Sequence, residues 1–125
     1  MVENNLSYVI RGAAFNVYNE LGPGLLESVY EAALAFELEK DGYSVQKQKG
    51  LPVHYQGHTL DLGFRLDLLI ENRIIVEIKS VEALLPVHHK QLLTYLKLTN
   101  NKLGLLINFN TDNLKHNIKR MVNNL

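Results

Sequence analysis

The chain contains no cysteine among its 125 residues. A disulfide framework and a thiolate metal site are therefore excluded. No apolar run approaches the roughly 18 residues that a membrane span needs. The N-terminal residues also lack the basic and apolar regions of a signal peptide. We therefore expect a soluble, cytoplasmic protein with no membrane partner.

Net charge is also absent, because 13 Lys and Arg residues balance 13 Asp and Glu residues. Binding along a nucleic acid depends on neutralising phosphates, so this balance argues against a protein that coats nucleic acid. It remains compatible with an enzyme that engages nucleic acid locally, or with an oligomer that pools small basic patches. A hydrophobic content of 46% is enough for a core, and we expect residues 1–125 to form one domain.

Hydrophobic periodicity and turn-forming residues divide the chain into helices and strands. The predicted helices cover residues 6–21, 25–40, 86–98 and 112 or 113 to 122, and the predicted strands cover 43–55, 60–70, 73–80 and 103–109. The order α-α-β-β-β-α-β-α combines an antiparallel run with a right-handed strand–helix–strand crossover. It predicts an α/β fold with a mixed sheet and helices on both faces. Pro52 places the first strand at an edge or in an irregular passage.

The segment RIIVEIKS, residues 73–80, carries two charges inside an otherwise apolar strand. Side chains two apart share a face, so Glu77 and Lys79 lie together. The same alternation in the strand at residues 60–70 predicts one apolar face and one face that includes a carboxylate. These faces comprise Leu66, Leu68 and Ile70 on one side, and Arg65, Asp67 and Leu69 on the other. For an isolated E-x-K, an ion pair or two solvated charges is the commoner explanation.

Two carboxylates on one sheet face, Asp67 and Glu77, would repel each other unless a cation lay between them. Oxygen ligands of this kind suit Mg²⁺ or Mn²⁺. In a hairpin, a two-residue turn would put the two acids on opposite faces. The site therefore requires an odd loop, such as Glu71-Asn72-Arg73, or a bulge. Asn72 tolerates the left-handed backbone that such a loop uses.

Two predicted helices add polar residues at helical spacing. In GLLESVY, Glu27 and Tyr30 share a face. Judged alone, Glu27 is explained by the favourable dipole at a helix N-terminus. In the helix at residues 86–98, His88, Gln91 and Tyr95 form a stripe that, judged alone, is a half-buried polar seam.

Taken together, these motifs resemble one family along essentially the whole chain. ELGPGLLESVYEAAL, the D-x9-E-x-K spacing through Asp67, Glu77 and Lys79, PVHHKQLLTYLKLT and LGLLINF follow one another as in the GxxExxY family. That family is assigned to the PD-(D/E)XK nuclease superfamily, and this chain resembles the branch with a Q-x3-Y motif. The resemblance implies a restriction-endonuclease-like core. Family members often carry His where this chain has Tyr18, and Leu66 replaces the proline of the superfamily's name.

The resemblance also implies roles for individual residues. Asp67 and Glu77 match the metal-binding acids, and Lys79 matches the motif lysine. Glu27 matches a first-helix glutamate that supports the metal or its waters. Gln91 matches a glutamine that contacts the lysine region or the substrate backbone, and Tyr95 would lie beside it. Tyr30 and His88 are supporting members of the same motifs.

Other sites are weaker candidates. The five histidines lack the spacing and accompanying acid of a zinc site. Gly22-Pro23-Gly24 lacks the Lys-Ser/Thr of a phosphate loop and is expected to form a turn. A basic rim is possible, with scattered surface charge as the alternative; its members would be Lys47, Lys49, Arg65, Lys90 and Lys97.

We therefore expect a Mg²⁺- or Mn²⁺-dependent nuclease that hydrolyses phosphodiester bonds of DNA or RNA. The alternative is a nuclease-fold interaction module with weak or no turnover, working in a homo-oligomer or with a protein partner.

Overall fold

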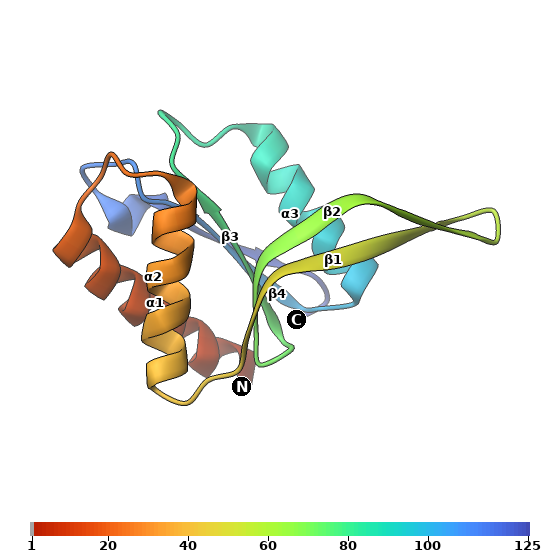
Figure 1. Ribbon diagram of the computed structural model, residues 1–125, viewed down its shortest axis with the longest axis horizontal. Coiled ribbons are helices and arrows are strands. Elements are labelled where there is room, and N and C mark those ends of the chain that lie inside the picture. Colours follow the sequence, from red (N-terminus) through yellow and green to blue (C-terminus); the bar gives the residue numbers. More distant parts are fainter. Residues whose placement is uncertain (1) are drawn as a thin grey trace.

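A computed structural model describes residues 2–125, except for the side chains of residues 61–63. Figure 1 shows a twisted sheet with helices on both of its faces. The helices are α1 (Val2–Leu21), α2 (Glu27–Lys40) and α3 (Pro86–Thr99), and a short 3₁₀ helix, η1, spans Leu114–Asn117. The strands are β1 (Val45–Tyr55), β2 (His58–Ile70), β3 (Ile74–Lys79), β4 (Leu103–Asn108) and β5 (Ile118–Val122).

The five strands lie in sequence order, β1-β2-β3-β4-β5. Neighbouring strands are antiparallel except β3 and β4, which are parallel and are joined by α3. The predicted mixed α/β sheet and its crossover are therefore confirmed. The prediction that Pro52 belongs to an edge strand is also confirmed, because β1 is an outer strand and its register shifts between Leu51 and Val53.

The core has two parts, one on each face of the sheet. The larger part packs α1 and α2 against Leu68, Ile70, Ile74, Val76 and Ile78 of β2 and β3. Leu103, Leu105 and Ile107 of β4 belong to the same part. The smaller part packs Leu92, Tyr95 and Leu96 of α3 against Leu66, Leu69, Ile75 and Leu106. β4 is buried along its whole length, as expected for a strand that is covered on both faces.

The last predicted helix is wrong: residues 114–117 form one 3₁₀ turn, and residues 118–122 form β5. The side chain of Asn113 makes no capping hydrogen bond. β4 is buried, and without β5 the backbone groups along one of its edges would have no ladder partner. The need to pair that edge outweighs the local capping signal at Asn113.

The predicted face of Leu66 is also wrong. Leu66 packs beneath α3, whereas Leu68 and Ile70 pack beneath α1 and α2. The alternation breaks beside Asp67, where the pairing of β2 with β3 ends at Leu68 and Val76. Beyond this point β2 pairs only with β1, and the twist of that two-stranded ribbon turns Leu66 toward α3.

None of the described helices is long and apolar enough to cross a membrane.

Gly104 of β4 tests how tightly the smaller core is packed. A Cβ at this position would lie 2.8 Å from Leu92 Cδ1 and 3.1 Å from Leu92 Cγ. We expect Gly104→Ala to lower the free energy of unfolding by about 1–3 kcal/mol, because a buried leucine would be forced out of its rotamer. Urea denaturation measures this change.

Gly50→Ala is the matched control, because nothing lies within 4 Å of the added Cβ at that glycine in β1. Equal stability of the two variants would contradict the tight contact between β4 and α3.

Candidate active site at the fork of β2 and β3

The turn between β2 and β3 sets which residues face each other. Ile70 pairs with Ile74 and Leu68 pairs with Val76, so the loop is Glu71-Asn72-Arg73. Glu71 and Asn72 have φ of 52° and 55°, and the Arg73 N–H donates to the Ile70 carbonyl at 2.9 Å. The odd loop required by the sequence is confirmed. The row after Leu68 and Val76 therefore sets Asp67 opposite Glu77.

At that row the two carboxylates replace the backbone ladder. The Asp67 N–H donates to Glu77 Oε2 at 2.8 Å, and the Ile78 N–H donates to Asp67 Oδ2 at 2.8 Å. Each acid thus accepts a backbone hydrogen bond from the opposite strand. This reciprocal pair, which we call the carboxylate fork, holds the strands together where carbonyl acceptors no longer meet the N–H groups.

The carboxylate fork is electrostatically costly. Only 4% of Glu77 is exposed, and desolvation together with the neighbouring Asp67 charge raises the pKa of Glu77 to about 8. Desolvation also raises the pKa of Asp67, against the Ile78 N–H and the Lys79 ammonium. The Lys79 charge also lowers the pKa of Glu77, but by less than burial raises it. A cation at this position would lower the cost of ionising both acids.

The donor set fits a Mg²⁺ or Mn²⁺ ion that keeps water or substrate ligands. Glu77 Oε1 accepts no hydrogen bond from the described residues, and Asp67 Oδ1 has one long contact of 3.4 Å with Gln48. Mg²⁺ is typically held by one or two carboxylates, with waters and phosphate oxygens completing its shell. Among the described residues no group of three or more His, Cys, Asp or Glu could hold a metal. The described residues therefore fit a metal ion that is held by two carboxylates, Asp67 and Glu77.

Glu27 lies at the start of α2, next to the end of β3. Its Oε2 accepts a hydrogen bond from the Ser80 N–H at 3.2 Å, and the Ser80 hydroxyl donates to the Leu25 carbonyl at 2.6 Å. The Glu27 charge contributes to raising the pKa of Asp67. The helix start and the strand end are therefore joined beside the carboxylate fork.

Tyr30 holds the loop that precedes α2. Its hydroxyl donates to the Gly22 carbonyl at 2.6 Å and accepts from the Leu25 N–H at 3.1 Å. Its buried ring stacks on Phe109, with centroids 4.5 Å apart. Tyr30 thus ties the turn before Glu27 to the larger core. This gives the G-x-x-E-x-x-Y spacing a physical reason.

Two residues of this region, Glu31 and Gln48, were not predicted from the sequence. Gln48 Nε2 donates to both carboxylate oxygens of Glu31, at 3.0 and 2.9 Å, and lies 3.4 Å from Asp67 Oδ1. Desolvation raises the pKa of Glu31, and the Asp67 and Glu27 charges act in the same direction. The i, i+4 spacing of Glu27 and Glu31 was a signal for Glu31. No local sequence pattern indicated Gln48. It lies in β1, and its backbone adopts a left-handed φ of 48° where its side chain approaches Asp67.

The predicted stripe on α3 divides into three different environments. Tyr95 is buried, packs edge-on against Phe64, and has a raised pKa because of desolvation and the Glu77 and Asp67 charges. His88 Nδ1 accepts the Leu85 N–H at 3.0 Å and so caps the helix. Gln91 is exposed and forms no hydrogen bond within the described part of the chain. Tyr95 therefore lies near the acids, and neither His88 nor Gln91 contacts them.

Tyr18, which stands where the family often has histidine, links two elements. Its hydroxyl donates to the Thr111 carbonyl in the loop after β4. This hydrogen bond gives Tyr18 a structural reason to be present.

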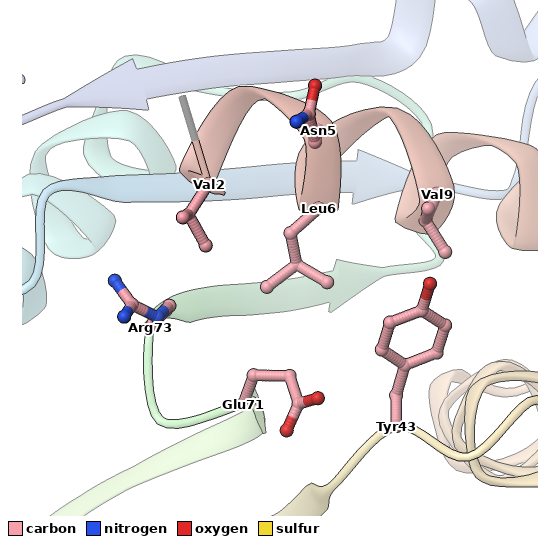
Figure 2. A pocket seen from close by; sticks show the side chains of 7 residues that line it. All are labelled: Val2, Asn5, Leu6, Val9, Tyr43, Glu71 and Arg73. Atoms are coloured by element: carbon pink, nitrogen blue, oxygen red, sulfur yellow. The ribbon is translucent and has the colours of Figure 1, made fainter.

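Three pockets of the described surface lie away from the carboxylate fork. Figure 2 shows one of about 410 Å³ between the first turns of α1 and the β2–β3 turn. Leu6, Val9, Tyr43, Glu71 and Arg73 are among the residues that line it. Arg73 precedes β3, whereas Glu77 and Lys79 lie at the other end of that strand. This pocket therefore belongs to the opposite end of the sheet.

A family model described as the PD-(D/E)XK nuclease superfamily matches residues 4–121. The match covers nearly the whole chain, and the chain therefore belongs to this superfamily. Its members generally use divalent metal ions and act on nucleic acid, and the restriction-endonuclease-like fold expected from the sequence is confirmed. No curated protein and no solved structure matches the chain.

The raised pKa of Glu77 predicts a pH-dependent stability for the metal-free protein. The folded-state value of about 8 lies above the ordinary 4.5, so the stabilisation is fully present below pH 4.5 and is lost as pH rises through 8. We expect the free energy of unfolding to fall by a few kcal/mol across this window in the presence of a chelator. Urea denaturation at a series of pH values measures this fall.

Glu77→Gln is expected to flatten that dependence, because the amide keeps an acceptor for Asp67 N–H and has no charge to bury. Glu20→Gln, on an exposed part of α1, is the control and keeps the wild-type slope. A Glu77→Gln curve that falls as steeply as wild type would show that Glu77 is not the titrating group.

Removing one hydroxyl tests the loop before α2. Tyr30→Phe keeps the stacking on Phe109 but leaves the Leu25 N–H and the Gly22 carbonyl without this partner. We expect a loss of about 1–2 kcal/mol of stability by thermal or urea unfolding. Tyr8→Phe is the control, because Tyr8 is 80% exposed, and its stability should stay at wild-type level.

Proposed function

We propose that this protein is a Mg²⁺- or Mn²⁺-dependent nuclease that hydrolyses phosphodiester bonds, with Asp67, Glu77 and Lys79 as its catalytic centre. The observation that carries the proposal is the carboxylate fork, in which the buried Glu77 and the half-buried Asp67 face each other across β2 and β3. Each accepts a backbone hydrogen bond of 2.8 Å from the opposite strand. Membership of the superfamily supports the same reaction. A cation bound between the two acids would offset the repulsion and the burial that raise their pKa values.

In this proposal Asp67 and Glu77 would hold the metal through the oxygens that the backbone does not engage. The cation, when bound, lowers the pKa of a water ligand and neutralises charge that builds on the phosphate. Lys79 is half-buried two residues beyond Glu77 and forms no ion pair within the described residues. Its ammonium is therefore available to orient a water or stabilise the phosphate oxygens.

The remaining residues would support this centre. Glu27 would accept hydrogen bonds from waters beside the metal through the oxygen that does not bind Ser80. Tyr95 would limit the access of bulk water to the acids from the α3 side. Gln91 projects from the same helix and would contact Lys79 or the substrate once substrate is present, while Tyr30 and His88 would act by fixing the starts of α2 and α3.

We further propose that the chain belongs to the GxxExxY branch of the superfamily. The support is the physical role of the motif: Tyr30 anchors the turn at Gly22–Leu25, and Glu27 is thereby set beside Ser80. The alternative function, a nuclease-fold interaction module without useful turnover, is separated from the enzyme by the following experiment.

Cleavage of a mixed panel of DNA and RNA, with Mg²⁺, with Mn²⁺ and with a chelator, tests the enzyme. We expect metal-dependent cleavage by wild type, and a loss of at least about 100-fold in Lys79→Ala and Asp67→Asn, as for the removal of a group that stabilises transition-state charge. Lys115→Ala, at an exposed lysine in η1, is the control and should cleave like wild type. Equal residual activity in wild type and Lys79→Ala would leave only the interaction module.

Calorimetric titration with Mn²⁺ tests the metal site without knowledge of the substrate. Wild type is expected to bind Mn²⁺ with release of a proton at pH 7, because Glu77, whose pKa is raised to about 8, must ionise to bind the metal. Glu77→Gln should lose this binding, whereas Glu20→Gln should keep it. Mn²⁺ binding that is indifferent to Glu77 would place the metal elsewhere.

A further inference from the structure

The β1–β2 hairpin projects beyond the rest of the molecule. Figure 1 shows it extending past α3 as a narrow ribbon with a free tip. Among the described pairings, β2 contacts β3 only through Leu68–Ile70, whereas it contacts β1 from Ile70 out to His58. Residues 49–66 therefore form a two-stranded ribbon without a third strand, which we call the arm.

The arm has little core of its own. In β1, Leu51 and Val53 are partly covered, whereas the tip from His54 to Leu60 is exposed. Tyr55 is 60% exposed, and Leu60 and Phe64 are more than one-third exposed. Isolated two-stranded hairpins are marginally stable in water. An exposed ribbon of this length is therefore explained better by a surface that it binds than by its contribution to the fold.

The charge of the arm differs from that of the whole chain. The arm, residues 49–66, holds two basic residues, Lys49 and Arg65, and one acid, Asp61, in a chain of zero net charge; Lys47 lies just before it. Lys47 is paired with Glu39 at 3.2 Å, but Lys49 and Arg65 have no acidic partner within the described residues. Arg65 donates to the Gln48 carbonyl at 3.3 Å and lies two residues before Asp67. Two available cations thus stand at the base of the arm, within two rows of Asp67.

We propose that the arm is the surface that binds the substrate, and that the substrate is double-stranded DNA. This inference rests on the proposed nuclease function and names the class of nucleic acid. The B-DNA major groove, about 12 Å wide, admits a two-stranded β-ribbon, whereas the major groove of an RNA helix is deep and narrow. Lys49 and Arg65 lie in neighbouring rows and therefore on opposite faces of the arm. Each contacts a backbone phosphate from its own face, and Tyr55 at the tip reaches the groove.

The geometry of the strand connects binding with cleavage. Arg65 and Asp67 belong to the same strand, about 7 Å apart along it. A phosphate held by Arg65 is therefore about two nucleotides away from the carboxylate fork, because a DNA strand advances about 3.4 Å per base along the axis. The arm would thus fix which phosphodiester bond enters the site.

Binding is tested with Lys79→Ala, which keeps the DNA intact, by fluorescence anisotropy with duplex DNA, duplex RNA and single-stranded DNA between about 50 and 200 mM salt. We expect duplex DNA to bind most tightly. Adding Lys49→Gln and Arg65→Gln should weaken binding by roughly tenfold for each lost contact at about 0.1 M salt, and should reduce the salt slope by about 1 for each. Lys49→Gln alone is the cleaner variant, because Lys49 forms none of the hydrogen bonds of the site.

Lys115→Gln with Lys119→Gln is the matched control, since both lysines are exposed and lie by the opposite outer strand, β5. Its affinity and salt slope should equal those of Lys79→Ala. Equal binding by the arm variant, or tighter binding of duplex RNA than of duplex DNA, would overturn the proposal. So would a change of sedimentation from dimer to monomer in the arm variant with DNA binding unchanged, because the arm would then be an interface between copies of the chain.

The absence of cysteine provides a direct contact test. Thr59→Cys near the tip, carrying a thiol-linked photo-crosslinker, should form covalent adducts with duplex DNA, and Lys115→Cys should not. Adducts of equal yield at both positions would contradict a DNA-binding arm. These readouts do not require cleavage: a protein that binds through the arm but cuts nothing refutes the nuclease alone, and one that cuts normally without the arm cations refutes the arm alone.

Discussion

The reciprocal hydrogen bonds of the carboxylate fork are the interaction on which the site depends. Where β2 turns away from β3, two backbone N–H groups would lose their acceptors, and the side chains of Asp67 and Glu77 take the place of the missing carbonyls. An unpaired buried N–H costs about as much as a lost hydrogen bond. The divergence of the strands and the presence of acids at this row therefore stabilise each other.

The surrounding elements are organised by the same divergence. On one side, β2 continues with β1 alone and becomes the arm. On the other, β3 ends at Lys79, and Ser80 directly after it hydrogen-bonds to both Leu25 and Glu27 at the start of α2. Tyr30 and Phe109 join that helix start to the buried centre of the sheet. A strand end, a helix start and a projecting ribbon thus meet at one row of residues, which is why residues far apart in sequence gather there.

The sequence predicted the features that depend on local periodicity or on the parity of a loop. The alternation in residues 74–79 has a period of two, and it correctly separated Glu77 from Val76 and Ile78. The same alternation required a loop with an odd number of residues between β2 and β3, so that Asp67 and Glu77 could share a face. The face of Leu66 was predicted wrongly, because alternation assumes a continuous ladder and the local sequence does not reveal where β2 leaves β3.

Other features required tertiary information. Residues 118–122 became a strand because buried β4 needed a partner, although Asn113 resembles a helix cap. Gln48 reaches Glu31 and Asp67 only through the register of β1 with β2 and a left-handed backbone at that glutamine. The roles of Gln91 and His88 inferred from the motif are not explained by contacts with the acids, since one is exposed and the other caps α3.

In the proposed nuclease, Asp67 and Glu77 would serve both the fold and the metal, and this bears on how such a site would decay over evolutionary time. Because both acids accept backbone hydrogen bonds in the metal-free fold, a descendant that lost its reaction would still be selected to retain them for folding. Lys79 has no comparable structural bond within the described residues and would be free to drift. In chains built on this plan, the lysine is therefore a better marker of surviving chemistry than the acids from which such sites are usually recognised.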